Sequence, residues 1–232
     1  MYKSILIKLS GESLMGDVSV VDKDKTKEIA KLIKKVHEMG IKVGIVIGGG
    51  NFFRGRSNKD MEPLYVDTMG MLGTTINALG LADAFKKEEL SCIISTPFDL
   101  NGLIPKYNKE EVLEKLEDNI VIFGGGTGHI GCSTDTAASN KASLMQADAI
   151  IKLTNVDGVY DKDPNKYDDA VMYDKLTHQE VLDNPEIKVM DIDAIRECKE
   201  NDIDILVINF NDKENLIRVL EGKEIGTRIS HE

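Results

Sequence analysis

Three glycine-rich segments each follow a short apolar run, and glycines placed in this way suit the binding of phosphate. The segments begin at Ser10, Gly48 and Gly124. Glycine lets the backbone approach a phosphate closely and point its N–H groups at the oxygens, and a helix that follows adds the positive end of its dipole. Three such segments predict two phosphate-bearing ligands, or one ligand with several phosphates. The alternative interpretation is that the glycines only end strands in tight turns.

Charged residues beside these segments fit phosphoryl transfer, a reaction that depends on positioning and positive charge. Lys8 lies inside an apolar run, where lysine is rare. It could reach a transferred phosphoryl group, or it could belong to an edge strand and extend to water. Arg54 closes the second segment and could pair with phosphate or only be solvated. Asp135 could orient Lys8 or a metal ion, or only complement a helix dipole.

Motifs for other kinds of nucleotide or metal binding are absent or incomplete. No glycine pair is followed by Lys-Ser or Lys-Thr, so none of the segments is a Walker A motif. Residues 126–131 fit the dinucleotide pattern GxGxxG, but the acid expected about 20 residues later is not well placed, since Asp148 comes too early and Asp157 too late. We interpret that match as incidental. His129 and Cys132 are too few to form a metal site, and we predict no protein-bound metal.

Composition limits the classes of protein to consider. The 232 residues carry 29 basic and 40 acidic side chains, a formal net charge of −11, which argues against non-specific nucleic-acid binding. Cys92, Cys132 and Cys198 form no CxxC pair, so a zinc site or a disulfide framework is not expected. The first apolar run is too short for a signal peptide, and no run approaches the ~18 apolar residues of a membrane span. The expected location is the cytoplasm, without a membrane partner.

Apolar runs alternate with amphipathic segments along the chain. The runs do not alternate apolar with polar residues, which is typical of strands buried on both faces of a parallel sheet. The predicted strands are 2–9, 41–47, 90–95, 120–123, 148–153, 203–209 and 225–229, and the predicted helices are 23–39, 66–87, 109–117, 135–146, 191–201 and 213–221. Loops with a small hairpin are expected over 154–174. The pattern predicts one α/β domain with helices on both faces of a mainly parallel sheet. The glycine segments then lie at the edge where such folds bind ligands.

Several segments resemble the bacterial UMP kinases, a branch of the amino-acid kinase family. The segments are KLSGE at 8–12, GGGNFFRG at 48–55, DTMGML at 67–72, TDTAA at 134–138, KLTNVDGVY at 152–160, DP at 163–164, VMD at 189–191 and GT at 226–227. They are colinear and cover nearly the whole chain. The resemblance implies a three-layer α/β/α fold over 1–232, a homohexamer, and phosphoryl transfer from ATP to UMP in pyrimidine nucleotide biosynthesis, with Mg²⁺ carried by the nucleotide phosphates.

The resemblance also implies roles for individual residues. Lys8, Arg54 and Asp135 would be catalytic. The expected ATP-binding residues are Lys8, Ser10, Gly11, Gly50, Arg54, Thr154, Tyr160 and Asp163. The expected UMP-binding residues are Gly49, Asp67, Gly126, Thr127, Gly128, His129, Ile130, Gly131, Cys132, Ser133 and Thr134. Residues up to about 145 would form the acceptor side, and about 146–232 the donor side.

Two departures from the bacterial pattern leave alternatives open. Residues 129–133 read His-Ile-Gly-Cys-Ser where the bacterial enzymes carry Asn-Pro-Phe-Phe-Thr, so both phenylalanines are missing. A kinase of the same family that acts on another small phosphate or carboxylate is therefore an alternative, as is a non-catalytic nucleotide- or oxyanion-binding protein. Residues 15–19 are shorter than the bacterial segment that contributes to activation by GTP, so such activation is not predicted.

Overall fold

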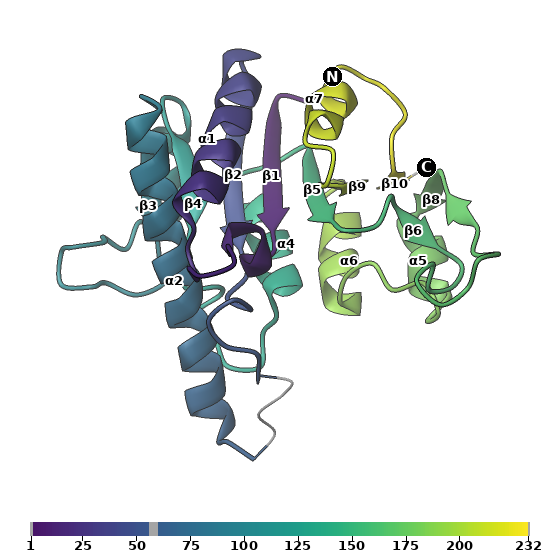
Figure 1. The fold of residues 1–232 in the computed structure, drawn as a ribbon, viewed down its shortest axis with the longest axis horizontal. Coiled ribbons are helices and arrows are strands. Elements are labelled where there is room, and N and C mark those ends of the chain that lie inside the picture. The colour runs from purple at the N-terminus through teal and green to yellow at the C-terminus, as the bar shows by residue number, and fades with distance from the viewer. Residues whose placement is uncertain (1, 56–59, 232) are drawn as a thin grey trace.

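An eight-stranded sheet forms the centre of the protein (Figure 1). The computed structural model describes residues 2–55 and 60–231. The strand order is β3-β4-β2-β1-β5-β9-β10-β8, and neighbours are parallel except β9 and β10. The strands are β1 (Ser4–Leu9), β2 (Lys42–Ile47), β3 (Cys92–Ser95), β4 (Ile120–Phe123), β5 (Ala149–Thr154), β8 (Lys175–Thr177), β9 (Asp204–Asn209) and β10 (Thr227–Ser230).

Helices cover both faces of this sheet, so the predicted three-layer α/β/α fold is confirmed. On one face lie α1 (Lys23–Glu38), α2 (Pro63–Lys87) and α7 (Glu214–Leu220). On the other lie α3 (Lys109–Leu116), α4 (Thr134–Leu144), α5 (His178–Asp183) and α6 (Ile192–Glu200). A 3-10 turn, η1 (Gly11–Leu14), follows β1. Among the described residues, no helix is both long enough and apolar enough to cross a bilayer.

The hydrophobic core consists of two clusters, one on each face of the sheet. Ile5 and Ile7 of β1 are fully buried in the cluster with α1, whereas Leu6, also fully buried, belongs to the cluster with α4. Successive side chains of a strand point to opposite faces. A strand between two helical layers must therefore be apolar on both faces, which explains the continuous apolar runs in the sequence.

The predicted strands and helices are all present, and no end is displaced by more than three residues. α2 begins at Pro63, earlier than the predicted residue 66, and proline suits a first helical position. The predicted hairpin is the antiparallel pair β6 (Val159–Tyr160) and β7 (Met172–Tyr173). β8 and α5 were not predicted. Thr177 and Glu180 form a capping box at the start of α5, which is a sequence signal for a helix N-terminus.

The position of β1 decides how Lys8 must be interpreted. β1 lies between β2 and β5 in the middle of the sheet, so the interpretation of Lys8 as an edge lysine is wrong. Lys8 is paired in register with Val46 of β2 and with Lys152 of β5. Because β1, β2, β4 and β5 are parallel, their carboxyl ends and the loops that follow lie at one edge of the sheet.

Candidate active site

A cleft of about 680 Å³ opens at this edge, and we call it the glycine cleft. It is bordered by the loops after β2 and β4 and by the first turns of α2 and α4. The predicted site residues that line it are Lys8, Gly49, Gly50, Arg54, Asp67, Gly126, Thr127, His129, Gly131, Cys132, Ser133, Thr134 and Asp135. The predicted residues that do not line it are Ser10, Gly11, Gly128, Ile130, Thr154, Tyr160 and Asp163.

Two lysines and one aspartate form a charged cluster, of which Lys8 and Asp135 line the glycine cleft. Lys8 Nζ lies 2.9 Å from Asp135 Oδ1, and Lys152 Nζ lies 3.5 Å from Asp135 Oδ2. The three side chains are only 16–18% exposed. Lys8 and Lys152 extend from the same face because they are paired residues on neighbouring parallel strands. One carboxylate thus holds two ammonium groups side by side, and the cluster keeps one net positive charge for an anion.

The protonation of this cluster follows from its burial and its charges. Burial raises the pKa of Asp135, but the charges and hydrogen bonds of Lys152 and Lys8 outweigh it and hold that pKa below its usual value. Burial and the nearby charge of Lys8 lower the pKa of Lys152, although Asp135 opposes the change. Asp135 therefore stays ionised, while Lys152 gives up its proton more readily than an exposed lysine. Asp135 lies in the first turn of α4 and also forms an ion pair with Lys8, so its contacts are not limited to the helix dipole.

Lys152 was missed as a site residue, although the signal that marked Lys8 applied to it equally. Each is a lysine inside an otherwise apolar strand. Besides Asp135, Lys152 Nζ donates to the carbonyl oxygen of Val189. The lining of the glycine cleft also contains residues that were not predicted, and those with polar or flexible side chains include Glu12, Met71 and Asp191.

The first two glycine loops pack tightly against each other. A Cβ atom on Gly11 would lie 2.6 Å from the carbonyl oxygen of Gly48 and would also overlap Asn51, so only glycine fits there. Next to this contact, Arg54 forms an ion pair with Glu12 of η1, and both side chains are largely exposed. The tight-turn and close-packing explanation therefore accounts for Gly11. It does not account for the charged groups that converge beside it.

The third loop is held in place by side chains of two helices. Asp67 of α2 accepts a hydrogen bond of 2.6 Å from the backbone N–H of Gly131. Ser133 is the N-cap of α4 and accepts from the N–H groups of Asp135 and Thr136. Gly126 lines the cleft with φ +58, and a Cβ atom there would meet only the Met71 side chain, at 3.9 Å. The loop thus presents backbone groups and small polar side chains to a ligand.

A second cavity of about 660 Å³ adjoins the glycine cleft, and we call it the α5–α6 cavity. Asp135 and Asp191 line both cavities, and Lys152 lines the second. The rest of its wall is mostly aliphatic: Val181, Leu182, Pro185, Ile187, Val189, Met190, Ile192 and Ile195, with Lys188 and Asp193. Thr154, Tyr160 and Asp163 are not among its lining residues. Two ligands bound in these cavities would meet at the Lys8–Asp135–Lys152 cluster.

Comparison with known proteins agrees with this architecture. The model of the amino acid kinase family matches residues 3–209. The structure superposes on UMP kinase from Bacillus anthracis with a TM-score of 0.94 and 33% identity, covering 100% of this chain and 97% of that one. For UMP kinase from Ureaplasma parvum the TM-score is 0.92 at 33% identity, with 99% of each chain covered. For uridylate kinase from Archaeoglobus fulgidus it is 0.75 at 29% identity, covering 97% and 99%. The chain belongs to the amino acid kinase family.

Proposed function

We propose that the protein is a UMP kinase, which transfers the γ-phosphoryl group of ATP to UMP and releases ADP and UDP. The observation that carries the proposal is the meeting of two cavities at the Lys8–Asp135–Lys152 cluster. A kinase must bring two anionic substrates together at a point of positive charge. The similarity to UMP kinases over nearly the whole chain supports the choice of substrates. Such an enzyme would act in pyrimidine nucleotide biosynthesis in the cytoplasm.

We assign UMP to the glycine cleft. Asp67 uses one carboxylate oxygen for Gly131, and its other oxygen is available for ribose hydroxyls, which donate hydrogen bonds. The backbone of 126–134 and Gly49 would hold the rest of the nucleotide. This assignment puts the acceptor largely on residues 1–145.

We assign the adenosine of ATP to the side of the chain formed by about 146–232. The aliphatic wall of the α5–α6 cavity suits a flat base, because ligand pockets bury most of a ligand against apolar side chains. The phosphates would extend toward Lys8, Gly50 and Arg54, with Ser10 and Gly11 beside them. Thr154, Tyr160 and Asp163 do not line this cavity, so the expectation that they border the adenosine is a second placement of the base, on the same side of the chain.

The proposed reaction is an in-line displacement at the γ-phosphorus. An oxygen of the UMP phosphate forms the new P–O bond, and the bond from the γ-phosphorus to the bridging oxygen of ADP breaks. No general base is needed, because the attacking phosphate is already an anion. Lys8 and Lys152 would neutralise charge on the transferred group, and Arg54 would bind a neighbouring phosphate. Asp135 holds both lysines in position.

Phosphoryl transfer from ATP implies Mg²⁺. The residues where the two cavities meet fit an ion that is bound mainly by the phosphates. Within residues 2–55 and 60–231, no three His, Cys, Asp or Glu side chains are arranged to hold a metal ion. Asp135 is already bonded to two lysines. Mg²⁺ keeps several waters and commonly binds phosphates with few protein ligands. The bound nucleotide would hold the ion, which supplies charge neutralisation on the phosphates.

An apolar stripe on α2 supports the proposed homo-oligomer. Its members, each 41–61% exposed, are Tyr65, Met69, Leu72, Ile76 and Leu79. The spacing of four and three residues is that of a helix seam that packs on another helix. The stripe is nearly symmetric about Leu72, so an antiparallel second copy could match it. Leu72→Glu should lower the mass measured by light scattering, and Lys86→Glu on the same helix is the control. An unchanged mass would show that this stripe is not a subunit interface. We propose that the assembly is a hexamer.

A coupled assay for ADP release tests the function. We expect turnover with UMP and a clear preference over CMP and dUMP. A preference for a non-nucleotide phosphate or carboxylate would favour the alternative kinase, which the 128–133 segment motivates. ATP binding without release of ADP for any acceptor would favour a non-catalytic binding protein.

A further inference from the structure

Asp191 lies where the two cavities meet. It is the residue before α6 and lines both the glycine cleft and the α5–α6 cavity. An aspartate at this N-cap position usually accepts hydrogen bonds from the first N–H groups of its own helix, which stabilises the helix by roughly 0.5–2 kcal/mol. Asp191 makes no such bond. Its carboxylate is turned away from α6.

The carboxylate contacts the start of α4 instead. Asp191 Oδ2 accepts a hydrogen bond from the Ser133 hydroxyl, and Thr136 Oγ1 lies 3.5 Å away. The Ser133 oxygen accepts in turn from the N–H groups of Asp135 and Thr136, at 3.0 and 3.1 Å. A hydroxyl has one proton and two lone pairs. All three are used here, so Asp191 fixes the rotation of the hydroxyl that caps α4.

A second bond anchors the same stretch of chain from the other side. Lys152 donates to the carbonyl oxygen of Val189, two residues before Asp191. Lys152 and Ser133 are both connected to Asp135, one through its side chain and the other through its backbone. The bonds form a closed ring that runs from Asp135 through Lys152 and the 189–191 segment to Ser133 and back to Asp135.

We propose that Asp191 is a positioning residue, which holds the end of the third glycine loop and the first turn of α4 so that Asp135 keeps Lys8 and Lys152 aligned. The inference rests on the proposed function and adds to it a residue that acts through Ser133. The Asp191–Ser133 bond is exposed, so it contributes little to the free energy of unfolding. Its effect is on geometry, and a displacement of about 1 Å in a reacting group can reduce a rate by about 100-fold.

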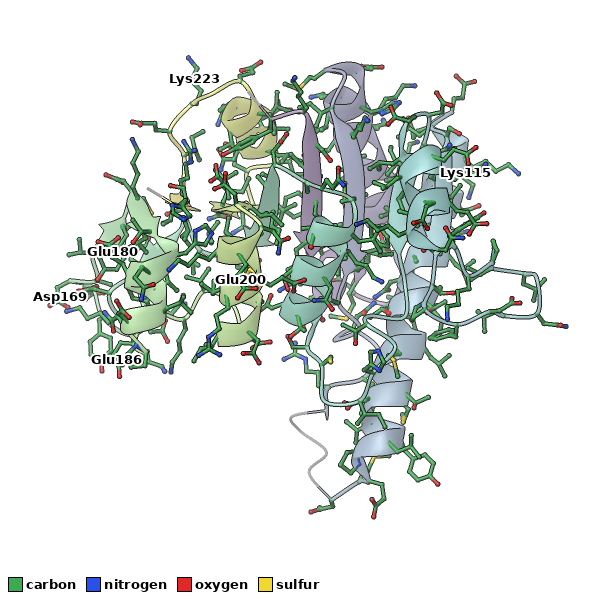
Figure 2. All side chains as sticks on the ribbon, turned by 180° about the vertical axis from the view of Figure 1, so that it is seen from behind. Lys115, Asp169, Glu180, Glu186, Glu200 and Lys223 are labelled. Atoms are coloured by element: carbon green, nitrogen blue, oxygen red, sulfur yellow. The ribbon has the colours of Figure 1, made fainter. Side chains whose placement is uncertain are left out.

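The test compares Asp191→Ala with Asp191→Asn. The amide oxygen of asparagine can still accept from Ser133, so Asp191→Asn should keep most of the wild-type kcat. Asp191→Ala should lower kcat by about 10- to 100-fold, with much smaller changes in the KM values and in Tm. Glu200→Ala is the matched control, since it removes one carboxylate from the exposed far end of α6 (Figure 2). Equal losses in the asparagine and alanine variants would overturn the proposal and point to a direct charge contact with substrate or Mg²⁺.

A double-mutant cycle tests the route through Ser133. If Asp191 acts through that hydroxyl, Asp191→Ala should have no further effect on kcat in a Ser133→Ala background. Independent, multiplying losses would contradict the proposal.

Amide hydrogen exchange gives a readout that does not depend on activity. Asp191→Ala should speed exchange of the Thr136 amide in the first turn of α4, and unchanged exchange would contradict the positioning role. If the wild-type protein fails to phosphorylate UMP, the proposed function fails, whereas the exchange measurement still decides whether Asp191 holds α4.

Discussion

The glycine cleft and the α5–α6 cavity share two residues but are built in different ways. Backbone, small polar side chains and charges from strand ends dominate the lining of the glycine cleft. Aliphatic side chains from residues 181–195 form most of the α5–α6 cavity. The first kind of lining suits phosphate and ribose, and the second suits an apolar ring. Under the proposed function, the sheet edge would hold the reacting groups, and the helical segment beside it would hold a remote part of the donor.

The largest effect is expected at the Lys8–Asp135–Lys152 cluster, which the two cavities share. Lys8→Ala should lower kcat by about 100- to 1,000-fold, because it removes a positive charge from the place where the phosphoryl group is transferred. Both KM values should change much less. Lys223→Ala is the control, since Lys223 is exposed at the end of the molecule away from the cleft (Figure 2). Near-normal turnover by a folded Lys8→Ala protein would refute the proposed mechanism.

A substitution of Asp67 should distinguish the ligand of the glycine cleft from that of the α5–α6 cavity. Asp67→Ala should raise the KM for UMP by about 10- to 100-fold, since a hydrogen bond to a charged group contributes roughly 1.5–3 kcal/mol, and leave the KM for ATP nearly unchanged. The variant should also discriminate less between UMP and dUMP, if the carboxylate binds ribose hydroxyls. Asp60→Ala, an exposed carboxylate before α2, is the control. Equal increases in both KM values would break the assignment of one substrate to each cavity.

Met190 provides the reciprocal test in the α5–α6 cavity. Met190→Asp replaces an aliphatic wall residue with a charge and should raise the KM for ATP by about tenfold, since apolar contacts of this size contribute roughly 1–3 kcal/mol. The KM for UMP should stay near the wild-type value. Lys188→Asp, on the same wall, shows whether charge alone has this effect. An unchanged KM for ATP in Met190→Asp would place the adenosine elsewhere, for example nearer Tyr160.

The two cavities also differ in how far the sequence could predict them. The glycine cleft was predicted because its parts are local: apolar strands end in glycines, and parallel strands place their ends at one edge. Lys8 and Asp135 could be recognised one at a time. The register that places Lys152 beside Lys8 joins residues 144 positions apart, and no local pattern contains it.

The α5–α6 cavity could not be predicted from the same signals. Hydrophobic periodicity shows which residues are covered, but an aliphatic side chain that faces a cavity has the same pattern as one that fills a core. β8 and α5, which flank this region, have three and six residues and are too short to give a clear period. The ring from Asp135 to Asp191 depends on where Val189 comes to lie in three dimensions, and the motif Val-Met-Asp alone did not show it.

The smallest expected effect concerns the pH dependence of the shared cluster. An ordinary lysine has a pKa of about 10.4. Burial and the charge of Lys8 lower the pKa of Lys152, so Lys152 loses its proton at a lower pH than an ordinary lysine does. If protonated Lys152 neutralises the transferred group, kcat should fall as the pH rises through that lowered pKa. Lys152→Arg should be less active at neutral pH because of its different shape, but its kcat should not show this alkaline decline, since guanidinium stays protonated.

The measurement is a kcat–pH profile of both proteins from neutral pH upward, with saturating ATP and UMP so that binding does not contribute. The same alkaline decline in Lys152→Arg would assign it to another group and leave Lys152 with only a structural role. Lys162→Arg, in the loop after β6, is the control and should keep the wild-type profile. Because Lys152 lies next to both cavities, loss of its proton should lower kcat for UMP and for a slow alternative acceptor alike, whereas a group in the glycine cleft alone would affect the two acceptors differently.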